Sequence, residues 1–128
     1  MYSPITVPFG GRMLFNIVRL KSGVDMDDVE LALAEMCHVV KETYGDEKGG
    51  FIAGQVFRFS GFISEEGSVV SGSETPHLAI VTYWKSYEQH EASHADAAFK
   101  EKFSALAAFC TSTQELGYDM LWQGVPET

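Results

Sequence analysis

The sequence predicts one α+β domain whose elements follow in the order β-α-β-β-α-β. The clearest indication is the apolar run from His77 to Trp84, which is rich in β-branched and aromatic residues and leads straight into a helix. Earlier in the chain, two more runs with strand-like composition, residues 12–20 and 51–64, enclose a segment with helical apolar spacing. This order is the ferredoxin-like arrangement, a four-stranded antiparallel sheet with two helices on one face.

The first strand, residues 12–20, carries apolar side chains on both faces. Leu14 and Val18 share one face with the amide Asn16, and the opposite face is mostly apolar as well. Both faces of such a strand must be covered. The helix that follows is predicted to begin after the N-cap Asp25 and to continue to the glycine-rich loop before the second strand.

The second strand is predicted to span residues 51–64, where Gly54 and Gly61 indicate a bulge or a bend. A polar loop, residues 65–76, leads to the third strand. Ser86 then N-caps the second helix, because a glutamine three residues later gives the spacing of a capping box.

The second helix is predicted to bend near Ser93, where Asp96 N-caps a further helical segment. Residues 111–115 are expected to be a linker, and residues 116–124 the last strand, with Trp122 among the aromatic residues on one face. The chain thus divides into an N-terminal arm, one ferredoxin-like domain and a C-terminal tail, at residues 1–11, 12–124 and 125–128.

The composition argues against several classes of partner. The formal net charge of −9 disfavours nucleic acid and anionic membrane surfaces, since both require clustered Lys and Arg. No apolar run reaches the length of a transmembrane helix, and the N-terminus lacks the pattern of a secretory signal. We therefore expect a cytoplasmic protein with no nucleic-acid or membrane partner.

A homodimer is expected because two helices cover only one face of the sheet. The other face also carries apolar side chains, among them Phe15, Ile17, Val81 and Tyr83. An apolar face of this size is unfavourable in water. A second copy, packed sheet against sheet, would cover it in a symmetric arrangement.

Three short motifs resemble those of a known family: FNIVRLKSG in the first strand, IVTYWKS at the end of the third, and DAAFKEKF in the second helix. Together with the order and length of the elements, they resemble the antibiotic-biosynthesis-monooxygenase-type domain of the dimeric α/β-barrel superfamily. The resemblance implies a dimeric α/β barrel. It also implies a pocket for a small apolar or aromatic ligand between the helices and the sheet of each subunit.

The same resemblance suggests residues for that pocket. Cofactor-free quinone-forming oxygenases and haem-degrading monooxygenases of this kind use a strand asparagine and a strand-end tryptophan, which match Asn16 and Trp84. The haem-degrading members also bind iron through a histidine on the second helix, and the matching position here is Phe103. The resemblance therefore supplies no axial ligand for haem.

Asn16 and Trp84 have N–H groups that suit a developing oxyanion or a substrate oxygen in a dry pocket. The structural alternative is a hydrogen-bonded core amide at Asn16 and a large aromatic residue that closes the end of the strand at Trp84. His94, or else His90, is the candidate base, because histidine has a usable pKa. The predicted substrate contacts are His90, Phe99 and Phe103.

His90 and His94 are also four residues apart, a spacing that occurs in zinc sites. No third ligand follows at metal-site spacing, so the sequence predicts no metal there. Partly exposed helix histidines are the structural alternative. No cofactor is expected either, because the chain contains no dinucleotide or phosphate-binding motif.

These features favour a cofactor-independent monooxygenase that acts on a small aromatic or quinol-like compound. Such a compound, once deprotonated, reduces O2 itself, so the protein needs to supply only a pocket, hydrogen-bond donors and one base. The first alternative is a non-catalytic binding or structural protein of the same fold, with its cavity filled by Phe51, Phe57, Phe99 and Phe103. The second alternative is a haem-degrading monooxygenase.

Overall fold

The computed structural model of the chain describes residues 2–70 and 77–127. Its helices and strands follow in the order β1 (Arg12–Leu20), α1 (Met26–Tyr44), β2 (Phe51–Arg58), β3 (Phe62–Ile63), β4 (Val69–Val70), β5 (His77–Trp84), α2 (Tyr87–His94), α3 (Ala97–Ala107) and β6 (Cys110–Asp119). Four strands form an antiparallel sheet in the order β2-β5-β1-β6. The predicted ferredoxin-like α+β fold is therefore confirmed.

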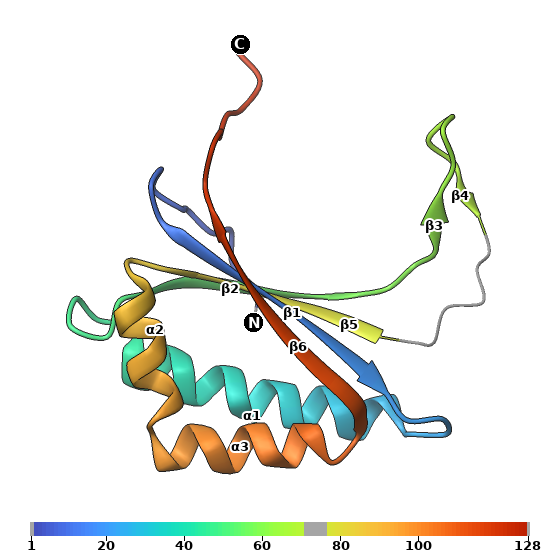
Figure 1. Cartoon of the computed structure of the whole chain (residues 1–128), viewed down its shortest axis with the longest axis horizontal. Helices are drawn as coiled ribbons and strands as arrows, with labels where there is room; N and C mark the ends of the chain where they lie inside the picture. Colours follow the sequence, from blue (N-terminus) through green and yellow to red (C-terminus); the bar gives the residue numbers. More distant parts are fainter. Residues whose placement is uncertain (1, 71–76, 128) are drawn as a thin grey trace.

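The helices lie on one face of this sheet (Figure 1). α1 and α3 run along its underside, and α2 closes one end. The short β3–β4 hairpin and the C-terminal tail rise on the opposite side. Among the described residues, no helix is long and apolar enough to cross a membrane.

The alternation predicted for β1 determines which residues face the helices. Leu14, Val18 and Leu20 are all buried, with at most 5% of each side chain exposed. Asn16 lies on the same face, and in the sheet it is paired with Ile80 on one side and Glu115 on the other. This row of residues across the sheet points towards the helices and forms the floor of the site described below.

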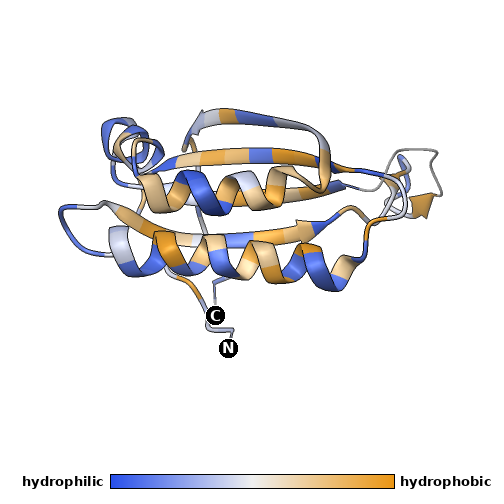
Figure 2. Ribbon diagram, turned by 90° about the horizontal axis from the view of Figure 1, so that it is seen from below, coloured by the Kyte–Doolittle hydropathy of each residue, from blue (hydrophilic) through white to orange (hydrophobic). Residues whose placement is uncertain are grey.

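The core lies between the sheet and the helices. Figure 2 shows apolar stripes along α1 and α3, each flanked by hydrophilic positions. The buried members of these stripes include Val29, Leu33 and Leu106, which pack against Val18 and Leu78 of the sheet. The apolar positions that recur with helical spacing in the sequence are therefore the positions that the fold buries.

The helix caps follow the sequence closely. Asp25 accepts a hydrogen bond from the backbone N–H of Asp27 and caps α1. Ser86 accepts from the N–H of Gln89, and Asp96 accepts from the N–H groups of Ala98 and Phe99 at the start of α3. The predicted bend before Asp96 is thus confirmed, and it divides the second helix into α2 and α3.

Three predicted boundaries were wrong. β2 ends at Arg58, and β3 begins at Phe62 after a break at residues 59–61. β6 begins at Cys110 and ends at Asp119, so residues 111–115 are strand and not linker. Trp122, predicted within that strand, lies beyond it and is 81% exposed. In the polar loop predicted at residues 65–76, residues 69–70 form β4, and positions 71–76 lie outside the described residues.

On the face of the sheet away from the helices, Phe15, Ile17 and Tyr83 are partly exposed, and Val81 is buried. Phe15 contacts Tyr118 edge to face, with ring centroids 6.4 Å apart.

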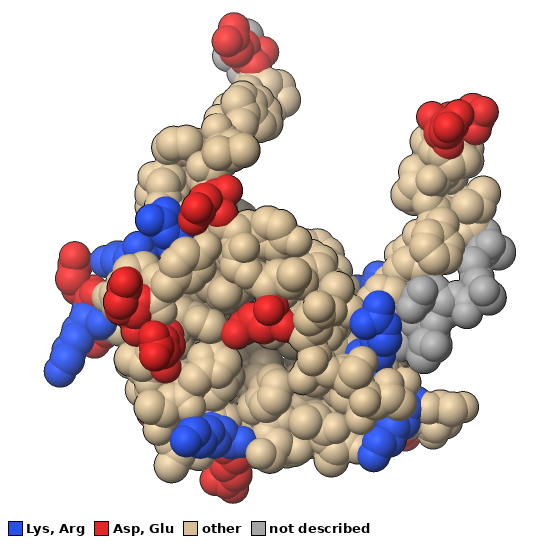
Figure 3. Space-filling model, in the orientation of Figure 1, with Lys and Arg blue, Asp and Glu red and all other residues tan. Residues whose placement is uncertain are grey.

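In Figure 3, Lys and Arg are scattered among acidic groups on the visible face and do not form one basic patch.

A side-chain hydrogen bond at the edge of the core joins two helices. The Tyr44 hydroxyl donates a hydrogen bond of 2.7 Å to Asp96 and so joins the end of α1 to the start of α3. Burial, together with this bond, raises the pKa of Tyr44 to about 12, and the bond lowers the pKa of Asp96. We expect Tyr44→Phe to lower Tm by about 3–6 °C at neutral pH.

The pH dependence follows from the direction of the two shifts. A raised tyrosine pKa stabilises the fold below pH 10, and that stabilisation is lost as pH rises towards 12. A lowered aspartate pKa stabilises the fold above its ordinary value of 3.8, and this is lost on acidification. The Tm values of Tyr44→Phe and wild type should therefore differ most between pH 3.8 and pH 10. Equal Tm values across this whole range would contradict a stabilising role for the Tyr44–Asp96 hydrogen bond.

Candidate functional site

A pocket of about 940 Å³ opens between the sheet and the helices. Its apolar wall includes Met36 and Val40 of α1 and the stacked rings of Phe99 and Phe103 of α3. All six residues that the sequence suggested for a site line this pocket: Asn16, Trp84, His90, His94, Phe99 and Phe103. They come from β1, β5, α2 and α3, so the fold brings together residues that are far apart in the sequence.

The aromatic residues of the predicted filled cavity do not close the pocket. Phe51, Phe57, Phe99 and Phe103 line it, and Phe57 remains 50% exposed. Phe103 is also the position that the resemblance matched to a haem ligand, and it contributes a ring to the wall.

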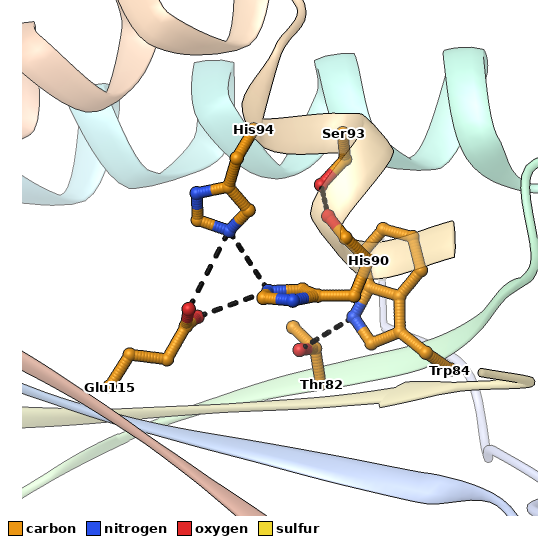
Figure 4. A network of polar contacts seen from close by, with 6 residues as sticks. All are labelled: Thr82, Trp84, His90, Ser93, His94 and Glu115. Carbon is orange, nitrogen blue, oxygen red and sulfur yellow. Dashed lines mark hydrogen bonds and ion pairs between the residues drawn. The ribbon is translucent and has the colours of Figure 1, made fainter. Parts of the chain in front are cut away.

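The polar end of the pocket is a triad of two histidines and one carboxylate (Figure 4). The His90 and His94 side chains descend from α2 and meet Glu115, which rises from β6. His90 Nε2 lies 3.2 Å from Glu115 Oε2 and 2.9 Å from His94 Nε2. His94 Nε2 lies 3.6 Å from Glu115 Oε1. We refer to His90, His94 and Glu115 as the triad.

Neighbouring rings hold both imidazoles in place. The Trp84 ring packs edge-on against His90 at 5.2 Å, and Phe99 packs against His94 at 5.0 Å between ring centroids. The side chain of His90 is 13% exposed, whereas that of His94 is 43% exposed. His94 is therefore the histidine that a molecule in the pocket can reach more easily.

The environment keeps Glu115 ionised. Burial alone would raise the pKa of Glu115, but hydrogen bonds from His90 and Asn16 and the charges of the two histidines lower it overall. Burial lowers the pKa of His94, and His90 lowers it further, while Glu115 acts in the opposite direction. At neutral pH the pocket thus contains a carboxylate beside a neutral imidazole that is able to accept a proton.

The two predicted donors lie beside acceptors of the protein itself. Asn16 is the neighbour of Glu115 in the sheet, and its amide helps to lower the pKa of that carboxylate. The indole N–H of Trp84, 2% exposed, donates to Thr82 Oγ1 at 2.9 Å. Asn16 keeps a second N–H for another acceptor, while Trp84 serves as a wall of the pocket beside His90.

Glu115 is the site residue that the sequence reasoning missed. The sequence argument against a metal was that no third ligand follows His90 and His94 at metal-site spacing; the fold brings the carboxylate of Glu115 to both histidines from a different element. The missed signal was the position of Glu115 in β6, opposite Asn16 and on the helix side of the sheet. Placing residues 111–115 in a linker concealed it.

No model of a known protein family and no curated protein matches the chain. Solved structures do match. SnoaB, described as a cofactor-independent oxygenase from Streptomyces nogalater, is 12% identical with a TM-score of 0.64, over 92% of this chain and 99% of that one. A Caulobacter crescentus protein, provisionally described as an antibiotic biosynthesis monooxygenase, is 11% identical with a TM-score of 0.63, over 89% and 92%.

A hydroxynitrile lyase from Passiflora edulis is 10% identical with a TM-score of 0.65, over 92% of this chain and 100% of that one. Two further similar structures are described as dimeric proteins with a ferredoxin-like fold. Identities this low establish the fold and leave the reaction open. The chain therefore has the ferredoxin-like α+β fold that structures described as antibiotic biosynthesis monooxygenases also have.

Proposed function

We propose that the protein is a monooxygenase that oxidises a small aromatic or quinol-like compound in this pocket without a redox cofactor of its own. The observation that carries the proposal is that two imidazoles and a carboxylate meet at one end of an apolar pocket, with the Asn16 amide beside the carboxylate in the sheet. The similarity of fold to a cofactor-independent oxygenase supports it. A hydroxynitrile lyase has a similar fold, so the same fold also supports acid–base chemistry of another kind.

In the proposed reaction, His94 accepts a proton from an acidic C–H of a substrate such as an anthrone, in which a phenolic ring system stabilises the anion. Glu115, 3.6 Å from His94 Nε2, stabilises the imidazolium that forms. The substrate anion then transfers electrons to O2, a C–O bond forms, and the resulting peroxide anion takes the proton back from His94 to give a hydroperoxide. Loss of water converts that CH–OOH group into a carbonyl.

The reaction is balanced without an external reductant. One O2 is consumed for each CH2 group converted to C=O, and the second oxygen atom leaves as water. Asn16 would support the reaction in two ways: its amide helps to keep Glu115 ionised, and an amide N–H at the pocket wall could stabilise negative charge that develops on the substrate. The apolar walls favour an aromatic ligand.

Oxygen uptake tests the proposal directly. Chelator-treated protein should be incubated with anthrones, hydroquinones and phenols while O2 and products are measured. We expect one O2 per molecule of product and incorporation of one labelled oxygen atom from 18O2. Absence of both aromatic binding and protein-dependent O2 uptake across this panel would refute it.

We further propose that the protein acts as a cytoplasmic homodimer. On the face of the sheet away from the helices, Phe15, Ile17 and Tyr83 are partly exposed, and Tyr118 is 47% exposed. We expect Tyr83→Asp to dissociate or unfold the dimer, because the charge would be buried between two sheets. Sedimentation at micromolar concentration measures this.

Leu31→Asp is the matched control. Leu31 is an apolar residue on the outer side of α1 and is 61% exposed. The same charge at this position should leave the dimer intact. A wild-type protein that sediments as a folded monomer would contradict the proposed assembly.

A further inference from the structure

We infer that the triad of His90, His94 and Glu115 is a binding site for one divalent first-row transition-metal ion. This inference goes beyond the proposed oxygenation and does not depend on it, because binding of an ion is measured without a substrate. The two histidines have a zinc-like spacing in the sequence with no third ligand near them, and the fold supplies a third ligand from β6.

The distances between the imidazole nitrogens and the carboxylate oxygens carry the inference. Metal–nitrogen and metal–oxygen bonds of about 2.0–2.2 Å place two ligand atoms roughly 3.0 Å apart at an angle of 90° and roughly 3.4 Å apart at the tetrahedral angle. The two Nε2 atoms are 2.9 Å apart, and Glu115 approaches them with different oxygens: Oε2 lies 3.2 Å from His90 Nε2 and Oε1 lies 3.6 Å from His94 Nε2. One ligand atom from each residue lies within 4.8 Å of the other two, so a small rotation of the carboxylate would let one ion bind both imidazoles and one or both of the oxygens.

Hydrogen bonding satisfies the same atoms poorly. His90 Nε2 and His94 Nε2 face each other, and both also face the carboxylate of Glu115. A neutral imidazole carries one N–H. If both Nε2 atoms carry the proton, the two N–H groups point at each other and repel. If only one Nε2 carries it, the lone pair of the other Nε2 faces the negatively charged carboxylate. A cation at the centre would accept both lone pairs and one carboxylate oxygen.

The surroundings resemble those of an organised metal site. Asn16 lies beside Glu115 in the sheet, and Trp84 and Phe99 pack against the two imidazoles, so each ligand has a neighbour that restricts its movement. All three residues line the pocket. The remaining coordination positions would face the pocket, where water or an oxygen of a small ligand can bind.

The ligand set selects the kind of ion. Two imidazoles and one carboxylate suit Zn²⁺, Co²⁺, Ni²⁺ or Fe²⁺, whereas Mg²⁺ and Ca²⁺ prefer oxygen ligands in larger number. A bound ion would also use the lone pair with which His94 would accept a proton. Metal binding and the proposed base chemistry therefore exclude each other, and added Zn²⁺ is expected to inhibit a metal-free enzyme.

The test is a titration of the full chain, without an affinity tag and after chelator treatment. Co²⁺ should produce visible absorption bands that saturate at one ion per chain, and calorimetry with Zn²⁺ should give the same stoichiometry. Mg²⁺ and Ca²⁺ should give no saturable binding. An absence of Co²⁺ bands and of Zn²⁺ binding heat would overturn the inference.

Variants then locate the ion. Glu115→Gln keeps the size of the side chain and should weaken Co²⁺ binding more than about a hundredfold, as should His94→Ala. His38→Ala removes an exposed histidine of α1 outside the triad and should leave the affinity unchanged. Thermal unfolding of each variant verifies its fold. Co²⁺ affinity that is unchanged in Glu115→Gln and His94→Ala, or lost in His38→Ala, would also overturn the inference.

Discussion

His94→Ala is expected to lower kcat/KM for an activated aromatic substrate by about 10²–10⁴-fold, the range typical for loss of a general base. His94 is the more accessible histidine of the triad, and its lowered pKa leaves it neutral and able to accept a proton. The measurement is O2 uptake by chelator-treated protein at several substrate concentrations. Added imidazole should restore part of the rate, because the shortened side chain leaves room for it.

The control for His94→Ala is His38→Ala, which changes a histidine outside the pocket and should retain full activity. A rate for His94→Ala within about tenfold of wild type, with no response to imidazole, would assign the proton transfer to another group. The first residue to test would then be His90, 3.2 Å from Glu115.

Trp84→Ala is expected to reduce the free energy of unfolding by about 3–5 kcal/mol, because it removes a large side chain from the centre of the core. Trp84 is 2% exposed and contacts the rings of Tyr44, Phe51 and His90. Denaturant unfolding monitored by circular dichroism measures the change.

Trp84→Phe separates the packing of the ring from the role of its N–H. The variant retains most of the buried area but leaves Thr82 Oγ1 without its donor at 2.9 Å. We expect a loss of about 1–2 kcal/mol, smaller than that of the alanine variant. Equal stability of Trp84→Ala and wild type would show that this residue is not part of the core.

The fold was predictable because its main signals are local. The caps at Asp25, Ser86 and Asp96 and the apolar stripes of the helices follow from the sequence, as does the alternation in β1 that places Asn16 on the helix side. The pocket residues suggested by resemblance were also brought together, since the order of the strands determines where β1 and β5 lie.

Errors arose where hydrophobic patterning gives no signal. β6 is an edge strand, and most of its side chains are exposed, so residues 111–115 lack the apolar alternation that identifies a strand. Pairing with β1 makes this segment a strand and aims Glu115 at the histidines. The break after β2 includes Gly61, where the sequence did indicate a bulge or a bend; its φ of +134° disfavours other residues, and only the end of the strand at Arg58 was not predicted.

The most direct test of the functional pocket is to measure turnover and stability together for Asn16→Ala. If the pocket is functional, turnover should fall about a hundredfold, the usual effect of losing one oxyanion donor. Stability should change little, since the Glu115 side chain is 30% exposed and water can replace the amide. A loss of about 1–3 kcal/mol in the free energy of unfolding, with turnover unchanged, would instead identify Asn16 as a structural amide and contradict the account.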